Sequence, residues 1–328
     1  MMVKNILPMQ SLPVFAYLYI VKALTLLLLT VWLFAQPCTA ADNIYAVVIS
    51  GGRGKLYNHE RYWNDCAFLY RTLRHVYGLP GEHVTLLMAD GDDPATDTLL
   101  EGAGGLVSQP TDLDGDGSAD LHLAATAANV SQLFDRLATT LTADDHLFVY
   151  IIGHGERTPH GDVHLWLWNN EWMDAAELSA LLDRCHPATM NIVLGECHGG
   201  AFADQLKGER RIITAACAAD QLSWASADRP YDEFVYHWTC AIAGHDEQGR
   251  GVEADLDADG RVSMSEAYHY ACSHDRRPET PCLLSWPEDL AHRWSFSGMG
   301  DGSAVRSITT DDDKTPIYDL QGRMVKNP

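Results

Sequence analysis

The segments LFVYIIGHGE (residues 147–156) and NIVLGECHGG (residues 191–200) decide the fold that we predict for this chain. Each begins with a short apolar run, rich in aromatic and β-branched residues, that ends at a glycine, which is typical of a buried strand. Neither run alternates between apolar and polar residues, as expected when a parallel sheet is covered on both faces. We therefore predict an α/β fold around a mostly parallel sheet.

A reactive side chain follows each of these two strands. His154 lies just beyond the first run and Cys197 just beyond the second. Ligands of open α/β sheets bind beyond the carboxyl ends of the strands, so neighbouring parallel strands would bring both side chains to one edge. A cysteine is a nucleophile only as its thiolate, which a nearby imidazole favours. The small residues around Cys197 and His154 leave room for a substrate backbone.

These two sites resemble the legumain-type cysteine peptidases, which have the caspase-like fold. That family carries a His-Gly pair after one strand and a Glu-x-Cys-x-Gly/Ser-type turn after the next. Here the corresponding residues are His154-Gly155 and Glu196-Cys197-His198-Gly199, and the resemblance extends from about Tyr45 to about Gly244. It implies a three-layer α/β/α sandwich around a mostly parallel sheet, and cysteine endopeptidase activity.

The resemblance also implies a substrate pocket. Legumains have a similar Tyr-Asn-x-Arg stretch, in which the Asn assists the catalytic His and the Arg lines the pocket for the residue before the cut bond. It matches Asn58 and Arg61, with one extra residue between them here. The same matching places Ser223 on the pocket wall and Asp232 as the acid that reads the substrate. For Asn58 and Arg61 the alternatives are a helix cap and a solvated charge.

The charge of this pocket bears on specificity. Glu196 and Asp232 would make it acidic, and Arg61 would balance them. Such a zwitterionic pocket suits Asn, whose amide both donates and accepts hydrogen bonds, whereas without Arg61 the pocket would suit Lys or Arg. A helix beginning at Gly199 is expected to lower the thiol pKa of Cys197. Backbone N–H groups near Cys197 and Gly155 are expected to hold the oxyanion of the acyl intermediate.

Residues 255–266 form a full twelve-place EF-hand loop, which predicts a structural calcium site. Glycine occupies the sixth place, and an apolar residue the eighth. The predicted ligand positions are Asp255, Asp257, Asp259, Arg261, Ser263 and Glu266. The helix before the loop ends near Ala243, so the loop is expected to be solitary.

A second acidic turn, at residues 112–120, repeats part of this pattern. Asp residues at alternate positions, with a glycine after them, turn several carboxylates toward one centre, as calcium requires. No Glu stands at the twelfth place, so the loop is incomplete. The candidate ligands are Asp112, Asp114, Asp116 and Asp120. The alternatives are a weak calcium site and a solvated acidic turn. We predict no organic cofactor.

The amino-terminal residues predict export. Residues 12–36 are mostly apolar, residues 1–40 contain Lys4 and Lys22 and no acid, and a small-x-small pattern follows at 38–40, which together indicate a signal peptide over residues 1–40. A retained membrane anchor is the alternative. We expect a peptidase domain at 41–296, a polar linker and short tail at 297–328, and a secreted, cell-surface or periplasmic location without stable membrane association after cleavage.

Composition narrows the partners. The chain has 328 residues, 46% of them hydrophobic, and a net charge of −22. Such acidity argues against nucleic acid, because phosphates need Lys and Arg. It suits an exported protein that binds calcium and acts on peptides or proteins.

Cysteine usage leaves the disulfides open. Removal of the signal peptide leaves an odd number, which fits one free nucleophile and up to three disulfides in an oxidising compartment. The alternative is that most are reduced and buried, which we favour for Cys217. Cys272 and Cys282 lie close in sequence and are the expected bridge.

Residues 317–325 resemble sorting tails of bacterial type nine secretion, and the alternative is a disordered end with one short strand. The main functional hypothesis is a secreted cysteine endopeptidase that acts through a Cys-His dyad and an acyl-enzyme. The alternatives are a transamidase of the same family and a catalytically silent, calcium-stabilised binding module. A zinc enzyme is a weaker alternative. His154-Gly155-Glu156 fits the H-x-E motif of zinc deaminases, but their Pro-Cys-x-x-Cys motif is absent from the sequence.

The remaining pattern predicts the surrounding elements. Strands are expected at 44–50, 83–88, 211–215 and 281–286, helices at 57–77, 125–141, 175–185, 199–206, 231–242 and 264–272, a loop at 90–111 and a hairpin at 162–172.

Overall fold

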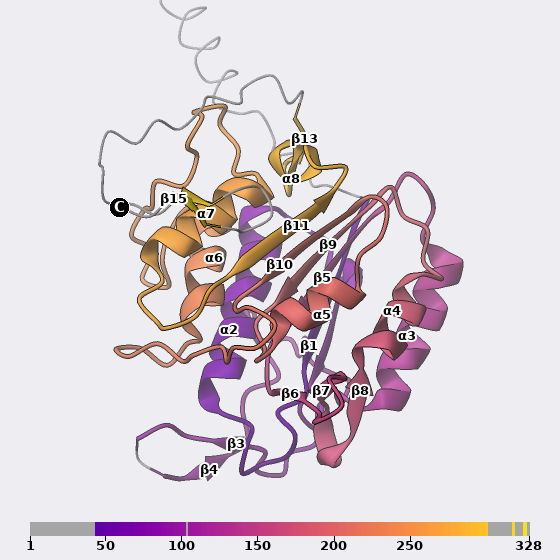
Figure 1. Cartoon of the computed structure of the whole chain (residues 1–328). Coiled ribbons are helices and arrows are strands. Elements are labelled where there is room, and N and C mark those ends of the chain that lie inside the picture. The colour runs from indigo at the N-terminus through magenta and orange to yellow at the C-terminus, as the bar shows by residue number, and fades with distance from the viewer. Residues whose placement is uncertain (1–42, 103, 301–316, 319–323, 327–328) are drawn as a thin grey trace, which may run out of the picture. The chain divides into compact units, whose positions relative to one another are not determined.

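A six-stranded sheet forms the centre of the protein (Figure 1). The computed structural model describes residues 43–102 and 104–300, together with strand residues 317–318 and 324–326. The strand order is β11-β10-β9-β5-β1-β2; all neighbours are parallel except β11, which pairs antiparallel with β10. These strands are β1 (Ile44–Ser50), β2 (Val84–Met88), β5 (His146–Ile151), β9 (Thr189–Leu194), β10 (Arg211–Ala215) and β11 (Cys282–Trp286).

Helices cover both faces of this sheet, and the predicted three-layer sandwich is confirmed (Figure 1). Helices α2 (Glu60–Arg71), α6 (Glu233–Ala243) and α7 (Met264–His274) pack on one face. Helices α3 (Ala127–Thr140), α4 (Ala175–Leu182) and α5 (Gly199–Gln205) pack on the other. The two faces arise because successive residues of a strand point to opposite sides. Val48 of β1 therefore joins the first core, while Val47 and Ile49 join the second.

The helix boundaries follow from local chemistry. The Thr126 side chain accepts a hydrogen bond from the backbone N–H of Asn129 and caps α3. Ser263 and Glu266 form a reciprocal capping box at the start of α7. Helix α6 ends where Gly244 takes a left-handed conformation, at φ 72°. Short helical turns precede and follow these elements: a π-helical turn η1 (Thr72–Val76) and the 3-10 turns η2 (Gly81–His83) and η3 (Trp168–Asn170).

Two small antiparallel sheets flank the carboxyl edge of the main sheet. Strands β6 (Gly155–Arg157), β7 (Val163–Trp166) and β8 (Trp172–Asp174) form the first, one strand more than the predicted hairpin. Strands β3 (Thr98–Leu99) and β4 (Leu106–Val107) form the second, inside the segment predicted as a loop. Both lie toward the same end of the sheet in Figure 1.

The carboxyl-terminal part continues with α8 (Leu290–Arg293), β12 (Trp294–Ser295) and β13 (Gly298–Met299). In the tail, β14 (Ile317–Tyr318) pairs with β15 (Met324–Lys326). The predicted signal peptide lies outside the described residues, and the domain boundaries stay predictions. Within residues 43–102 and 104–300, no helix is long and apolar enough to cross a membrane.

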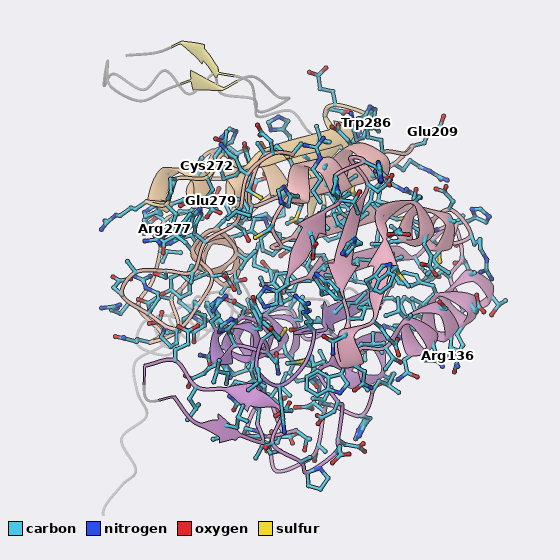
Figure 2. All side chains as sticks on the ribbon, turned by 60° about the horizontal axis from the view of Figure 1, so that its bottom comes forward. Arg136, Glu209, Cys272, Arg277, Glu279 and Trp286 are labelled. Atoms are coloured by element: carbon cyan, nitrogen blue, oxygen red, sulfur yellow. The ribbon has the colours of Figure 1, made fainter. Side chains whose placement is uncertain are left out.

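The predicted Cys272–Cys282 disulfide is wrong. All seven cysteines between Cys66 and Cys282 are free thiols. Cys272, on α7 and labelled in Figure 2, packs against the core on one face of the sheet, while Cys282, on β11, packs against the core on the other. Closeness in sequence therefore does not produce a bond between the two sulfur atoms.

Candidate active site

The two central strands bring His154 and Cys197 to one edge of the sheet. Strands β5 and β9 pair in parallel register through Ile151 and Leu194, and the Gly195 N–H donates to the Ile151 carbonyl at 2.8 Å. Beyond this point the segments that follow β5 and β9 contact each other. A Cβ atom on Gly155 would lie only 2.1 Å from the carbonyl oxygen of Cys197, so only glycine fits there.

His154 is held by the segment that follows β1. Its Nε2 lies 2.8 Å from the Tyr57 carbonyl oxygen, which can only accept a hydrogen bond. This contact places the ring proton on Nε2 and leaves Nδ1 as the acceptor. The Tyr62 hydroxyl lies 3.5 Å from Nδ1. Burial lowers the pKa of His154, and the charges of Arg61 and Arg53 lower it further.

Cys197 is partly exposed, and its Sγ lies 3.8 Å from the carbonyl oxygen of Ser223. The Ser223 hydroxyl in turn donates to the Gly195 carbonyl at 2.8 Å, which fixes this wall to the strand end. Burial raises the pKa of the Cys197 thiol, so the expected lowering by the amino end of α5 does not prevail.

Within the described part of the chain, no hydrogen bond joins Cys197 and His154. A raised thiol pKa and a lowered imidazole pKa favour a neutral thiol and a neutral imidazole at rest. The arrangement suits an imidazole that acts as a general base once a substrate draws the two groups together.

A charged cluster lies beside this pair, built from α2 and the start of α6. Arg61 Nε lies 3.1 Å from Asp232 Oδ1, and Arg61 Nη1 lies 2.6 Å from Glu101 Oε1. Arg61 Nη2 also donates to the Tyr62 hydroxyl at 3.1 Å. The Arg61 and Asp232 side chains are 14% and 8% exposed, so this ion pair is well shielded from water.

A second carboxyl group, that of Asp65, bonds the backbone of Asp232. Asp65, which is buried on α2, accepts the backbone N–H of Asp232 at 3.1 Å. Burial raises the pKa of Asp65, and the nearby Asp232 carboxylate raises it further. Asp65 is therefore held protonated, which spares the site a second buried negative charge.

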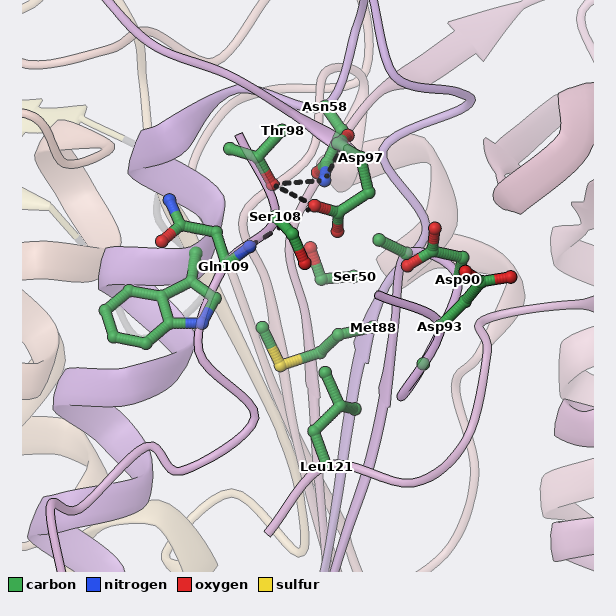
Figure 3. Close-up of a pocket in the computed structure, with 13 residues that line it drawn as sticks. Ser50, Asn58, Met88, Asp90, Asp93, Asp97, Thr98, Ser108, Gln109 and Leu121 are labelled. Carbon is green, nitrogen blue, oxygen red and sulfur yellow. Dashed lines mark hydrogen bonds between the residues drawn. The ribbon is translucent and has the colours of Figure 1, made fainter. Parts of the chain in front are cut away.

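Asn58 was expected to assist His154, but its side chain contacts other residues. Its side-chain Nδ2 donates to the Asp97 carbonyl and to Thr98 Oγ1, both at 3.1 Å, in a small pocket that Figure 3 shows. Gly52 packs so tightly on the same amide that a Cβ there would lie 2.4 Å from Asn58 Oδ1. The backbone carbonyl of the neighbouring Tyr57 contacts His154 instead.

Glu196 does not line the substrate pocket either. Its side chain is 0% exposed and lies beneath Gly155, where a Cβ would be 2.9 Å from Glu196 Cγ. Neither carboxyl oxygen has a hydrogen-bond partner, and burial raises the pKa of Glu196 to about 8. A side chain placed this way supports the floor of the site and cannot read a substrate.

Sequence reasoning missed four residues of this site. Tyr57 acts through its backbone, which no side-chain motif reveals. Tyr62 and Asp65 stood within the predicted helix without a motif of their own, and Glu101 lies in a segment predicted as a loop. The one available signal was spacing, because Asp65 follows Arg61 by four residues on one helix and so lies on the same helix face.

The EF-hand loop holds three carboxylates close together. Ligand oxygens of Asp255, Asp257 and Asp259 lie within 4.8 Å of one another, a spacing that a calcium ion can bridge. Glu266 Oε1 accepts the N–H groups of Leu256 and Asp257, which turns it toward the start of the loop. The residues therefore fit a hard cation bound by oxygen. The side chain of Arg261 pairs with Asp259, which leaves its carbonyl for the seventh place.

The second acidic turn brings together Asp112, Asp114 and Asp116, again within 4.8 Å. Asp120 is not part of this group. Its Oδ1 accepts the Tyr70 hydroxyl at 2.7 Å, and its Oδ2 accepts the Leu113 N–H at 2.7 Å. Its expected role as a ligand therefore gives way to a role in fastening the turn to α2.

A parallel α/β sandwich with a histidine and a cysteine at adjoining strand ends is the architecture of a cysteine peptidase. The model of the peptidase C13 family matches residues 44–270, well over half of the chain. The protein belongs to this family, the legumain family, whose members are cysteine peptidases that act on proteins. No curated protein matches the chain.

Proposed function

We propose that the protein is an exported cysteine endopeptidase with Cys197 as nucleophile and His154 as general base and acid. His154 Nδ1 takes the thiol proton as Sγ attacks the peptide carbonyl carbon. The C–N bond then breaks, and the imidazolium gives its proton to the departing amine. Water hydrolyses the thioester, which releases the acid and restores the thiol. The N–H groups of Gly155 and Cys197 are the proposed oxyanion donors.

The proposed specificity is cleavage after Asn. The observation that supports it is the Arg61–Asp232 ion pair, which is linked to the Ser223 segment by the hydrogen bond from the Glu233 N–H to the Trp224 carbonyl. An Asn side chain offers an N–H₂ donor for the Asp232 carboxylate and a carbonyl acceptor for the Arg61 guanidinium. A Lys or Arg side chain would meet the guanidinium as a like charge, so we assign these residues lower rates.

Peptides that end in Asn, Asp, Lys or Arg and carry a fluorescent aminocoumarin test this proposal. We expect release after Asn, loss of release in Cys197→Ala, and retention in Cys217→Ala, a matched control at a buried thiol. A thiol-reactive peptide electrophile should label wild type and Cys217→Ala but not Cys197→Ala. Release that persists in Cys197→Ala, or no release from any peptide, contradicts the proposal. Mass spectrometry with an added amine distinguishes hydrolysis from transamidation.

Export and calcium binding belong to the same proposal. The apolar amino-terminal segment and the net charge of −22 support a secreted protein, and the two acidic triads support bound calcium. Amino-terminal sequencing of protein recovered from the medium tests export. A mature chain that begins near residue 41 is the expected result, and a chain retained with residues 1–40 contradicts it.

A further inference from the structure

Three aromatic side chains and one arginine form a surface group next to His154 that the proposed chemistry does not use. We call it the aromatic shelf and define it as Tyr57, Trp166 and Trp172 with Arg53. Two distant segments build it: the loop after β1 supplies Arg53 and Tyr57, and strands β7 and β8 supply the two tryptophans. Trp172 is 53% exposed and Tyr57 47%, so ring surface faces solvent.

The aromatic shelf is preformed. The Arg53 guanidinium lies 4.8 Å from the centre of the Tyr57 ring and 4.1 Å from that of Trp166, so it joins the two rings by cation–π contacts. Asn170 and Glu156 accept hydrogen bonds from the Arg53 Nε and Trp166 Nε1 groups. Trp172 packs edge-to-face on Trp166, with ring centres 5.9 Å apart. These contacts hold Arg53 and Trp166 in place, and the exposed rings of Tyr57 and Trp172 remain for a ligand.

The shelf contacts His154. The charged cluster of Arg61, Asp232 and Glu101 also approaches His154, through the Tyr62 hydroxyl, but it is tied in addition to the segment beside Cys197. The Tyr57 carbonyl accepts a hydrogen bond from the imidazole, and the Tyr57 ring centre lies 6.3 Å from that of His154. The backbone N–H of Trp166 donates to the backbone carbonyl of His154 at 2.9 Å. Cys197 instead contacts Ser223, and the next residue, Trp224, bonds the start of α6 that carries Asp232.

These contacts indicate the direction of a bound peptide. The acyl part stays on Cys197, while the amine that leaves must meet His154 to receive its proton. The chain that continues from this amine therefore starts at the imidazole. We propose that the aromatic shelf binds the residues that follow the cut bond and selects a large apolar or aromatic side chain there. The inference rests on the proposed peptidase function and deepens it.

Internally quenched peptides with Asn before the cut bond, and either Phe or Gly at the two positions after it, measure this preference. We expect wild type to favour Phe over Gly in kcat/KM by roughly tenfold, the effect of burying part of an aromatic ring. Trp172→Ala should reduce the ratio to about two or less, and Trp172→Phe should restore most of it. Met299→Ala, which also removes an exposed large apolar side chain, is the matched control and should keep the wild-type ratio.

Two further measurements separate the possible failures. An aminocoumarin peptide has no residue after the cut bond, so its release by all four proteins together with equal ratios overturns the shelf and leaves the peptidase standing. Binding of the same peptides to Cys197→Ala protein reports the Phe preference without turnover, which tests the shelf even if cleavage is absent. Sedimentation of wild type and Trp172→Ala addresses another occupant: dimers lost in the variant would assign the shelf to a second copy and overturn the proposal.

Discussion

The carbonyl oxygen of Tyr57 lies 2.8 Å from Nε2 of His154. Since a carbonyl only accepts hydrogen bonds, this contact selects the tautomer with the proton on Nε2. Nδ1 is then the one ring nitrogen able to take a proton from Cys197. The orientation of the proposed base thus depends on a backbone atom, and it withstands any substitution at Tyr57 that leaves the chain path unchanged.

The first prediction concerns the resting protonation of Cys197 and His154. Burial lowers the pKa of His154 below its ordinary 6.5 and raises that of Cys197, so we expect no stable thiolate–imidazolium pair. Alkylation of Cys197 by iodoacetamide should slow by about tenfold per pH unit between about pH 8 and about pH 5. Turnover needs neutral imidazole, so kcat/KM should persist below pH 6.5. A plateau of fast alkylation at low pH would contradict both expectations.

The second prediction concerns Arg61. Arg61→Ala leaves the Asp232 carboxylate without its counter-charge, so cleavage after Asn should fall by about tenfold or more while cleavage after Lys or Arg rises. Loss of one partner from a shielded pair also costs about 3–5 kcal/mol of stability, which urea denaturation measures. Arg71→Ala, on the same helix, removes a bond to the Leu113 carbonyl and should leave the preference unchanged. An unchanged preference in Arg61→Ala assigns the specificity elsewhere.

The sheet was predictable because its strands are apolar runs bounded by turns. β1 at Ile44–Ser50 and β10 at Arg211–Ala215 match the predicted limits. β3 and β4 were missed because strands of two residues carry no periodicity, and they form through long-range pairing: β3 pairs with β4, and Leu99 also bridges to His59.

The candidate site was predictable only where a motif ends a strand. His154 and Cys197 are such residues, and parallel pairing of β5 with β9 brings their strand ends together. The contact between Asp65 and Asp232 spans 167 residues, and only the folded chain reveals it. Glu196 shows the opposite failure, because adjacency to Cys197 in sequence suggested a pocket lining. Glu196 lies in the bend after β9, where its side chain is buried beneath Gly155 instead.

The third prediction concerns Glu196 and the pH dependence of stability. Burial raises its pKa from 4.5 to about 8, so between these two values the unfolded chain gives up the Glu196 proton while the folded chain keeps it. The contribution of Glu196 to stability is therefore full below pH 4.5, and it is lost as the pH rises from there to about 8. In this range wild type should lose about 1.4 kcal/mol per pH unit relative to Glu196→Gln, which keeps the shape and cannot ionise, and above it the difference should level off. Urea denaturation at several pH values measures the difference. Parallel stability curves for the two proteins across this range would contradict the raised pKa of Glu196.

The fourth prediction concerns calcium. A ligand that binds only the folded chain stabilises it by about 2.7 kcal/mol at a hundred times its Kd, so calcium should raise Tm and a chelator should lower it. Asp255→Asn removes one negative charge at the first place of the EF-hand loop but keeps an oxygen for the N–H groups of Asp259 and Gly260. A loss of the calcium response in this variant therefore reports on the ion and not on the loop.

Asp112→Asn is the matched control, because Asp112 accepts the N–H groups of Gly115 and Gly117 in the same way in the other acidic turn. We expect Asp255→Asn to lose most of the Tm shift and Asp112→Asn to keep most of it, since only the EF-hand loop has a carboxylate at its twelfth place, Glu266. The reverse result would move the ion to the other turn. If calcium leaves the Tm of wild type, Asp255→Asn and Asp112→Asn unchanged, hydrogen bonds alone stabilise both loops.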